Sequence, residues 1–417
     1  MSDTRIRRGL VGQLQRLCVD LLLLLVNFSA VTLEWLTRNR KSGKVPKNIL
    51  VMRTAALGDF VLSIPAMQRL RATYPAAMFT LLTTASTHRE TLKTVDAYAR
   101  QSSPWLELLP KSLFQRIVVF SISSLAAAIK GNPDLPAGSY DACFILNEGI
   151  SLNLVGIVKK IGYLRLLGVR CRIYGIRTRA FPHLYPLAQV GPRRLEHHVI
   201  ALMRSVEEDS RVVCKPGAPV YFGLAKSQKE ENWAEAKIDE FGCRGDRLII
   251  VAPGSRLEFK RWPTQSYVKL VAALVKNCNT HVAMVGSGPE AVTVAEVVAQ
   301  SHALLGNTVR LHDLSGQTTI TQLAALLRRA AVFIGNDGGT CHLAAAVGCR
   351  VVSIGNGAEI PNSVEPWGNQ RFTVRFDVPC APCYSFTHCP KMANRCVTGI
   401  TVELVQKHVN DALFQRL

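Results

Sequence analysis

From residue 48 onward, short apolar runs alternate with longer segments whose apolar residues recur at helical spacing. Short continuous apolar runs are typical of strands buried on both faces, and helical spacing is typical of helices that pack on one face. The pattern predicts two successive series of strands and helices. In the first series we expect strands at Ile49–Arg53, Met78–Thr84, Arg116–Phe120, Ala142–Leu146 and Arg172–Ile176, and helices at Leu57–Thr73 and Arg193–Val206.

The second series follows residues 207–222, where Pro216 and Pro219 indicate a linker. The expected strands are Leu248–Ala252, His281–Gly286, Val309–Leu311, Ala331–Gly335 and Arg350–Ile354, and the expected helices are Thr264–Asn277, Glu290–Gln300, Thr319–Ala330 and Thr340–Val347. Alternation of strands and helices favours parallel sheets covered on both faces. We therefore predict an α/β fold of two Rossmann-like domains, residues 45–212 and 213–417, that face a cleft.

Residues 10–36 are predicted to form one long helix within an N-terminal segment, residues 1–44. The run is long enough to span a bilayer, which takes about 20 apolar residues. However, polar residues recur every seven positions and so lie on one stripe: Gln13, Asp20, Asn27 and Glu34. This stripe and the basic residues on both sides favour an amphipathic helix that lies on an anionic membrane surface. A helix docked on its own domain is the alternative.

The net charge of +20 is concentrated in two segments. Residues 1–53 contain ten Lys and Arg against three acidic residues, and residues 151–205 contain ten against Glu196 alone, so these segments contribute +7 and +9. The excess predicts an anionic partner, either a membrane surface or a charged glycan. Nucleic acid is not expected, because the basic segments carry no known motif and no interleaved aromatic residues.

The stretch Ala331–Gly348 is predicted to be a strand, a Gly-rich turn and a helix. Adjacent glycines at 338 and 339 allow a tight turn, and the N–H groups that open the next helix attract phosphate. An ordinary strand-to-helix turn would look similar. Asp337 and His342 favour binding, because each can bond to a polyol or a diphosphate.

Two further loops follow predicted strands at the carboxyl edges of the sheets. After the first strand of the first domain comes Asp59, preceded by Gly58, and its carboxylate can either accept a proton from a hydroxyl or cap the helix. After the first strand of the second domain, Gly254 and Ser255 can contact a phosphate, and Lys260 supplies a positive charge. A solvated basic loop is the alternative.

The segment Gly286–Ala291 fits the dinucleotide pattern G-x-G-x-x-G/A between a strand and a helix, with Asp313 downstream. This match supports a nicotinamide- or flavin-dependent oxidoreductase as an alternative function. Against it, Pro289 stands inside the pattern, and the match follows a complete α/β domain.

Four cysteines cluster at 380–396, namely Cys380, Cys383, Cys389 and Cys396. Four thiolates can hold zinc or an iron–sulfur cluster, but the spacing matches neither common pattern. Reduced thiols or a local disulfide are therefore favoured over a metal site.

Taken in order, these stretches resemble glycosyltransferase family 9, the bacterial heptosyltransferase-like family of lipopolysaccharide core biosynthesis. The likeness spans residues 48–400, and its motifs are RTAALGDFVLSIPAMQRLRATYP (Arg53–Pro75), PGSRLEFKRWP (Pro253–Pro263), VGSGPE (Val285–Glu290), FIGNDGGTCHLAAAVG (Phe333–Gly348) and the cysteine segment. The resemblance implies a GT-B fold that binds the acceptor on the first domain and a nucleotide-sugar on the second.

The resemblance also implies roles for individual residues. Asp59 matches the catalytic base, Lys260 the lysine that binds the donor phosphates, and Glu290 the acid that reaches the nucleotide ribose. The residues that match the donor-binding loops are Gly254, Ser255, Asp337, Gly338, Gly339, Thr340 and His342. The implied reaction is an inverting, metal-independent transfer of a heptose-like sugar, with an ADP-heptose-like donor and no cofactor.

The implied acceptor is an anionic lipid-linked glycan of the bacterial cell envelope, and the implied location is the cytoplasmic face of the inner membrane, as a peripheral protein. The chain departs from the family at Ala55 and Ala56, where hydroxyl residues are common, and at Ile354–Gly357, where Ile-Gly-Asn-Gly replaces the usual Phe-Gly-Pro turn. Besides the oxidoreductase, a non-catalytic glycan-binding protein of the same fold is an alternative.

Overall fold

The structure is a computed structural model of the 417-residue chain. It describes residues 45–84, 103–120, 139–146, 161–175 (without 163, 166 and 167), 196–214, 219–276, 280–306 and 310–414 (without 384, 386, 387, 390 and 392). The predicted helix over residues 10–36 lies outside these ranges. Of the helices that are described, none is both long and apolar enough to cross a bilayer.

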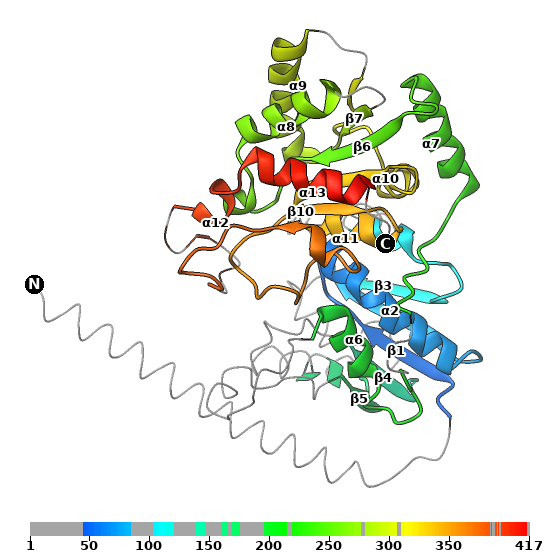
Figure 1. Ribbon diagram of the computed structural model, residues 1–417. Helices are drawn as coiled ribbons and strands as arrows, with labels where there is room; N and C mark the ends of the chain where they lie inside the picture. Colours follow the sequence, from blue (N-terminus) through cyan, green and yellow to red (C-terminus); the bar gives the residue numbers. More distant parts are fainter. Residues whose placement is uncertain are drawn as a thin grey trace, which may run out of the picture.

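The first sheet has five parallel strands in the order β3-β2-β1-β4-β5 (Figure 1). They are β1 (Asn48–Met52), β2 (Met78–Thr84), β3 (Arg116–Phe120), β4 (Ala142–Ile145) and β5 (Arg172–Tyr174). Residues 49–52 of the central strand β1 are all buried, as expected for a strand covered on both faces. Helices α2 (Leu57–Thr73) and α6 (His198–Val206) pack side by side on one of these faces.

The second sheet has six parallel strands in the order β11-β10-β9-β6-β7-β8. They are β6 (Arg247–Ala252), β7 (Thr280–Met284), β8 (Leu311–Asp313), β9 (Val332–Asn336), β10 (Val351–Ile354) and β11 (Thr373–Val374). Helices α8 (Thr264–Lys276), α9 (Ala291–Leu305) and α13 (Val402–Phe414) cover one face of this sheet. Helices α7 (Gln228–Glu240), α10 (Ile320–Leu327) and α11 (Gly339–Ala346) lie on the other, and the short α12 (Arg395–Thr398) follows the cysteine segment.

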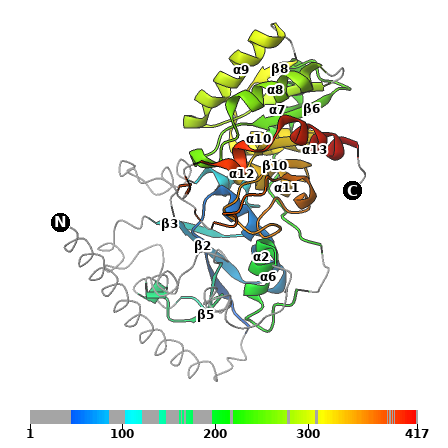
Figure 2. The ribbon, with the colours of Figure 1, turned by 60° about the vertical axis from the view of Figure 1, so that its left-hand side comes forward.

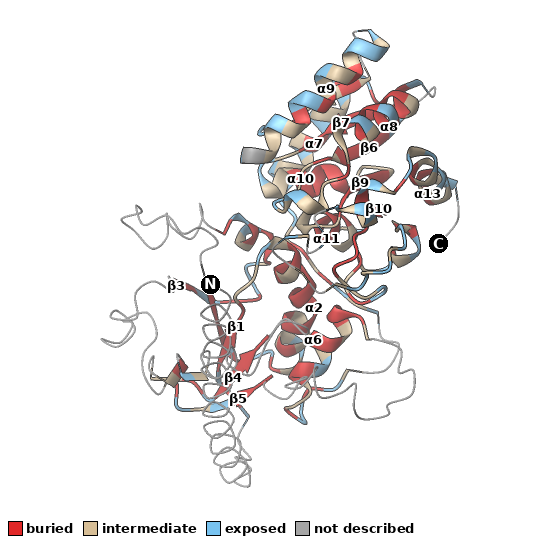
Figure 3. Ribbon diagram, turned by 90° about the vertical axis from the view of Figure 1, so that its left-hand side faces the viewer, coloured by how far each residue is buried: buried red, intermediate tan, exposed pale blue. Residues whose placement is uncertain are grey.

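A single apolar cluster continues from the helical layer of the first sheet into the second domain. Helix α2 packs against α11, and the 3-10 helix η1 (Pro104–Leu108) packs against α10. Figure 3 shows the buried residues along α2 and beneath α11. The two domains therefore meet through apolar contacts at the carboxyl ends of β1 and β9.

The predicted α/β fold with two parallel sheets is confirmed. Helix α2 and strands β2 and β3 have the predicted ends. The helix expected from Arg193 instead begins at His198. The Nδ1 atom of His197 accepts a hydrogen bond from the backbone N–H of Val199 at 3.2 Å and so caps the helix at this point. The domain limits at 45–212 and 213–417 stay a prediction.

Three described α-helices were not predicted from the sequence: the four-residue α12, and the longer α7 and α13. Helix α7 buries only Ala234 among its 13 residues, so it lacks the apolar stripe that marks an amphipathic helix. Helix α13 buries Val405, Val409 and Ala412, a spacing of four and three residues that does carry the helical signal.

Candidate active site

A cavity of about 510 Å³ lies between the two sheets. It is lined by loops that follow β1, β6, β7, β9 and β10, where the carboxyl ends of parallel strands of both domains converge. The sequence-predicted site residues all line it: Asp59, Gly254, Ser255, Lys260, Glu290, Asp337, Gly338, Gly339, Thr340 and His342. The structure thus brings together groups that are up to 283 residues apart in the chain (59 to 342).

The N-termini of α2 and α11, one helix from each domain, meet at this cavity. Figure 2 shows the ribbons of α2 and α11. A Cβ built on Gly58 of α2 would lie 2.7 Å from Cδ2 of His342, and one on Gly339 of α11 would lie 3.0 Å from the Gly58 nitrogen. Both positions require glycine because the helices approach so closely. Neither helix has a side-chain cap, so the N–H groups of both first turns, with the helix dipoles behind them, favour an anion.

Asp59 is the third residue of α2, and its side chain lines the cavity. The residue at the N-cap is Ala56, and no side-chain capping bond is present, so the capping alternative for Asp59 is not supported. The turn before the helix is fixed by the buried Arg53, which donates to the carbonyl oxygens of Leu146 at 2.9 Å and of Asp59. Because Arg53 fixes the backbone of Asp59, the Asp59 carboxylate is positioned at the cavity.

Lys260 and Asp337 form an ion pair, with Nζ 2.9 Å from Oδ2 and both side chains largely buried. The Asn356 amide donates to the same oxygen at 2.8 Å. Burial lowers the pKa of Lys260 and raises that of Asp337, but the mutual attraction outweighs burial in both, so the two groups stay charged. The positive charge predicted to meet the donor phosphates is thus balanced by a carboxylate of the same site.

His342 is buried beneath Gly58, with 7% of its surface exposed. Burial lowers its pKa, so the ring is neutral at pH 7. Its Nδ1 has no hydrogen-bond partner among the residues that the structure describes. The ring can therefore offer a polar atom to a ligand without adding charge.

The nucleotide side of the cavity is formed by two loops that pack on each other. A Cβ on Gly254 would lie 2.7 Å from Cβ of Glu290, so glycine is required there. The Glu290 carboxylate accepts long hydrogen bonds from the N–H and the hydroxyl of Ser287, at 3.4 and 3.3 Å. This carboxylate stands at the start of α9, where the dinucleotide pattern requires free N–H groups for a pyrophosphate. The oxidoreductase hypothesis drawn from Gly286–Ala291 is not supported.

Comparison with known proteins agrees with this geometry. The model of Glycosyltransferase family 9 (heptosyltransferase) matches residues 190–392. A curated relative, lipopolysaccharide heptosyltransferase 3 of Escherichia coli (strain K12), is 24% identical over 302 residues, which are 71% of this chain and 79% of the relative. The chain is therefore similar in sequence to glycosyltransferase family 9.

Solved structures of this family share the fold. The ADP-heptose LPS heptosyltransferase II of E. coli superposes with a TM-score of 0.58 and 18% identity, over 88% of this chain and 99% of that one. The family 9 glycosyltransferase of Veillonella parvula DSM 2008 gives a TM-score of 0.60 and 16% identity, over 89% and 98%. The predicted GT-B arrangement is confirmed.

Asn336, the last residue of β9, ties the loops of this site together. Its Oδ1 accepts from the Trp262 N–H at 2.9 Å and the Tyr267 hydroxyl at 3.0 Å. Its Nδ2 donates to the carbonyl oxygens of Pro253 and Gly254 at 2.7 and 3.1 Å. Asparagine in a Gly-rich turn is too common to signal this role. Other lining residues that the sequence did not indicate are His198, Arg256, Leu257 and Glu359.

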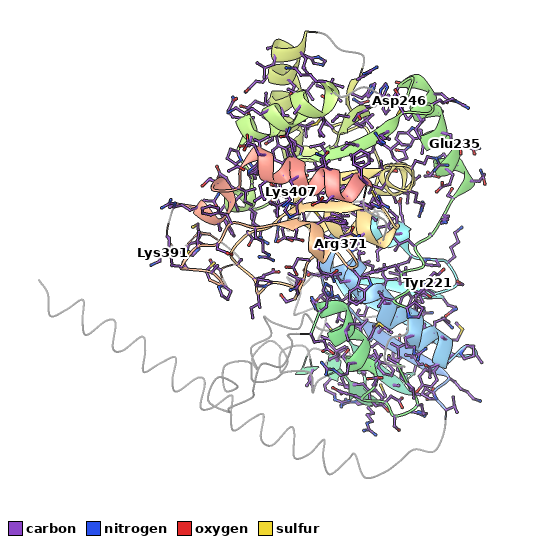
Figure 4. All side chains as sticks on the ribbon, viewed as in Figure 1. Tyr221, Glu235, Asp246, Arg371, Lys391 and Lys407 are labelled. Atoms are coloured by element: carbon purple, nitrogen blue, oxygen red, sulfur yellow. The ribbon has the colours of Figure 1, made fainter. Side chains whose placement is uncertain are left out.

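The cysteine segment lines a separate cavity of about 450 Å³ together with Phe259 and Phe376. Figure 4 places Lys391 of this segment at the edge of the molecule. Cys380, Cys383, Cys389 and Cys396 are all free thiols, so the local disulfide is wrong and reduced thiols are what the structure has. Within the described ranges, no group of three or more His, Cys, Asp or Glu side chains is placed to hold a metal ion, and the metal-site alternative stays untested.

Proposed function

We propose that this protein is an inverting heptosyltransferase that uses ADP-heptose as donor and a hydroxyl of an anionic lipid-linked glycan, such as lipopolysaccharide core, as acceptor. The similarity to family 9 and the names of the relatives support the sugar, the nucleotide and the acceptor class. The single observation that carries the proposal is the cavity in which Asp59 of one domain faces Lys260, Asp337 and the start of α11 from the other. Asp59, as a proton acceptor, and Lys260 with the start of α11, as a diphosphate site, therefore lie in the same cavity.

In the proposed reaction, Asp59 accepts the proton of the acceptor hydroxyl while that oxygen attacks C1 of the donor sugar. The new C1–O bond forms as the bond from C1 to the phosphate oxygen breaks on the opposite face, which inverts the anomeric carbon. Negative charge that develops on the leaving diphosphate is stabilised by Lys260 and by the N–H groups at the start of α11. Asp337 keeps Lys260 charged and fixed in position.

Binding and turnover measurements test this proposal. Calorimetry of the full chain with ADP-heptose, ADP, UDP-glucose and NAD⁺ should give tightest binding for ADP-heptose. Transfer to a deacylated core oligosaccharide should yield a product extended by one heptose. Binding of NAD⁺ in place of every nucleotide-sugar would overturn the proposal. Binding of ADP-heptose without any transfer would favour the non-catalytic glycan-binding alternative.

We further propose that the protein is peripheral, on the cytoplasmic face of the inner membrane, and that residues 1–44 bind it to the surface. The basic residues around the apolar run at 10–36 support this placement, because each can add about 1 kcal/mol of attraction to an anionic bilayer close to its surface. A lipid-linked acceptor would then reach the cavity from the membrane.

A further inference from the structure

Glu359 is a carboxyl group of the cavity that the proposed mechanism does not use. It lies in the loop after β10 and lines the cavity together with Asp59, Lys260 and Asp337. Its Oε2 is buried and has no hydrogen-bond partner among the described residues. A buried polar atom left without a partner is costly, so it indicates a missing ligand or water.

Two cations that line these cavities with Glu359, Lys260 and Arg375, are already paired with other carboxylates. Lys260 contacts Asp337 at 2.9 Å, and Arg375 contacts Glu365 at 2.5 Å, while its other nitrogen donates to the Asn356 carbonyl at 2.9 Å. Glu359 therefore stands beside a buried carboxylate without a cation of its own. Burial, followed by the charge of Asp337, raises the pKa of Glu359 to about 8.

A second, small cavity of about 10 Å³ is also lined by Glu359. Its lining includes Glu365 and Thr373, whose Oε2 and Oγ1 are also buried without partners in the described structure. This volume is about that of one water, and polar atoms surround it. One water in this cavity could bridge these atoms and hold the Glu359 side chain in position.

We propose that Glu359 determines donor specificity: as a neutral carboxylic acid it donates a hydrogen bond to a hydroxyl of the transferred sugar. The assignment rests on the proposed function. The position supports the sugar rather than the nucleotide, because Glu359 lies with Asp337 and Asp59 and the nucleotide side is formed by Gly254 and Glu290. The neutral form is compatible with the nearby diphosphate, which an ionised carboxylate would repel.

The test compares Glu359→Gln, which keeps a neutral donor of the same shape, with Glu359→Leu, which removes it. Calorimetry at pH 7 measures the Kd of ADP-heptose and of ADP alone. We expect Glu359→Leu to raise the Kd of ADP-heptose about tenfold and to leave that of ADP within twofold, since a hydrogen bond contributes about 1.4 kcal/mol or a factor of ten. Glu359→Gln should stay within threefold of the wild type for both. Glu258→Leu, an exposed carboxylate two residues from Lys260, is the matched control.

A pH series adds a readout that simple packing would not move. From pH 7 to 9 the wild type should lose affinity for ADP-heptose as Glu359 ionises, and Glu359→Gln should not. The other charged or titratable groups that line the cavity are Asp59, His198, Arg256, Lys260, Glu290, Asp337 and His342, and Glu365 and Arg375 line the small cavity with Glu359. They are unchanged in the variant, so the difference between the two proteins isolates Glu359.

Two results would overturn the assignment: unchanged Kd values in Glu359→Leu, or equal losses in the Gln and Leu variants, which would mean that an ionised carboxylate is required. Both of these results are informative only if the wild type binds ADP-heptose more tightly than ADP. A wild type that binds no nucleotide-sugar would instead refute the proposed function itself, and the assignment with it.

Discussion

Gly58 of α2 lies directly against the imidazole of His342 of α11, so a methyl group on its Cα would come within 2.7 Å of Cδ2. We expect Gly58→Ala to lower the free energy of unfolding by about 1–3 kcal/mol, the usual cost of overpacking. Thermal and denaturant unfolding measure it. Gly162→Ala is the control, because nothing lies within 4 Å of a Cβ there. The double variant Gly58→Ala/His342→Ala should lose less stability than the sum of the two single variants, because only the contact at Cδ2 is relieved and Cα of Gly339 stays 3.1 Å from the new Cβ. Additive losses would place the strain elsewhere.

Asp59→Asn should abolish transfer and leave donor binding almost unchanged. The carboxylate is expected to act on the acceptor hydroxyl in the transition state, and a general base contributes about 10²–10⁴-fold to the rate. Transfer rates and the Kd of ADP-heptose for the same preparation test this. Turnover at the wild-type rate would exclude Asp59 as the base.

Lys260→Met should weaken ADP binding and also destabilise the fold, because Asp337 is then left buried without its cation. Removal of one partner of a buried pair costs about 3–5 kcal/mol, and loss of a charge-assisted contact to the ligand costs about 1.5–3 kcal/mol. The double variant Lys260→Met/Asp337→Asn should regain stability but not affinity. If it regains both, Lys260 does not contact the diphosphate.

Glu359 should make the stability of the protein fall as the pH rises. Its pKa is about 8 in the folded chain and 4.5 in the reference state, so between these values the folded state keeps a proton that the unfolded state releases. Unfolding is then increasingly favoured up to about pH 8. The difference in free energy of unfolding between Glu359→Gln and the wild type should therefore grow from pH 5 to pH 8. A constant difference would contradict the raised pKa.

Deletion of residues 1–44 should give a protein that still folds and transfers heptose to a soluble acceptor. No predicted strand lies before Ile49, and the described sheet begins at Asn48. Co-flotation with anionic vesicles should be lost in the truncated chain. High salt should release the full chain only in part, because apolar burial is not screened. An unfolded truncated chain would mean that the segment belongs to the domain core.

The sequence was sufficient to predict how the site is assembled. Parallel strands place the loops that follow them at one edge, so Asp59, Lys260 and Asp337 could be expected to meet once the two series of strands were recognised. Helix α2, Leu57–Thr73, was predicted to the residue, and Pro75 lies just beyond its end.

The roles of Asn336 and Glu359 could not be predicted in this way. Asn336 bonds to four groups from residues 253–267, and nothing in its own segment indicates them. Glu359 can serve as a hydrogen-bond donor because Lys260 and Arg375 form ion pairs with Asp337 and Glu365 instead of with Glu359. Such competition between charges depends on tertiary packing. Helix α7 was not predicted because its residues are almost all polar and only Ala234 is buried, so it lacks an apolar stripe.

The apolar cluster shared by the two domains affects how this protein can be recombined with its relatives. Chimeras that exchange one domain are a natural way to alter donor or acceptor choice in a two-domain transferase. Here the exchanged half would have to match Leu57 and Gly58 on α2 with Gly339 and His342 on α11, since these atoms are in direct contact. A productive crossover would therefore carry both helix N-termini from the same parent.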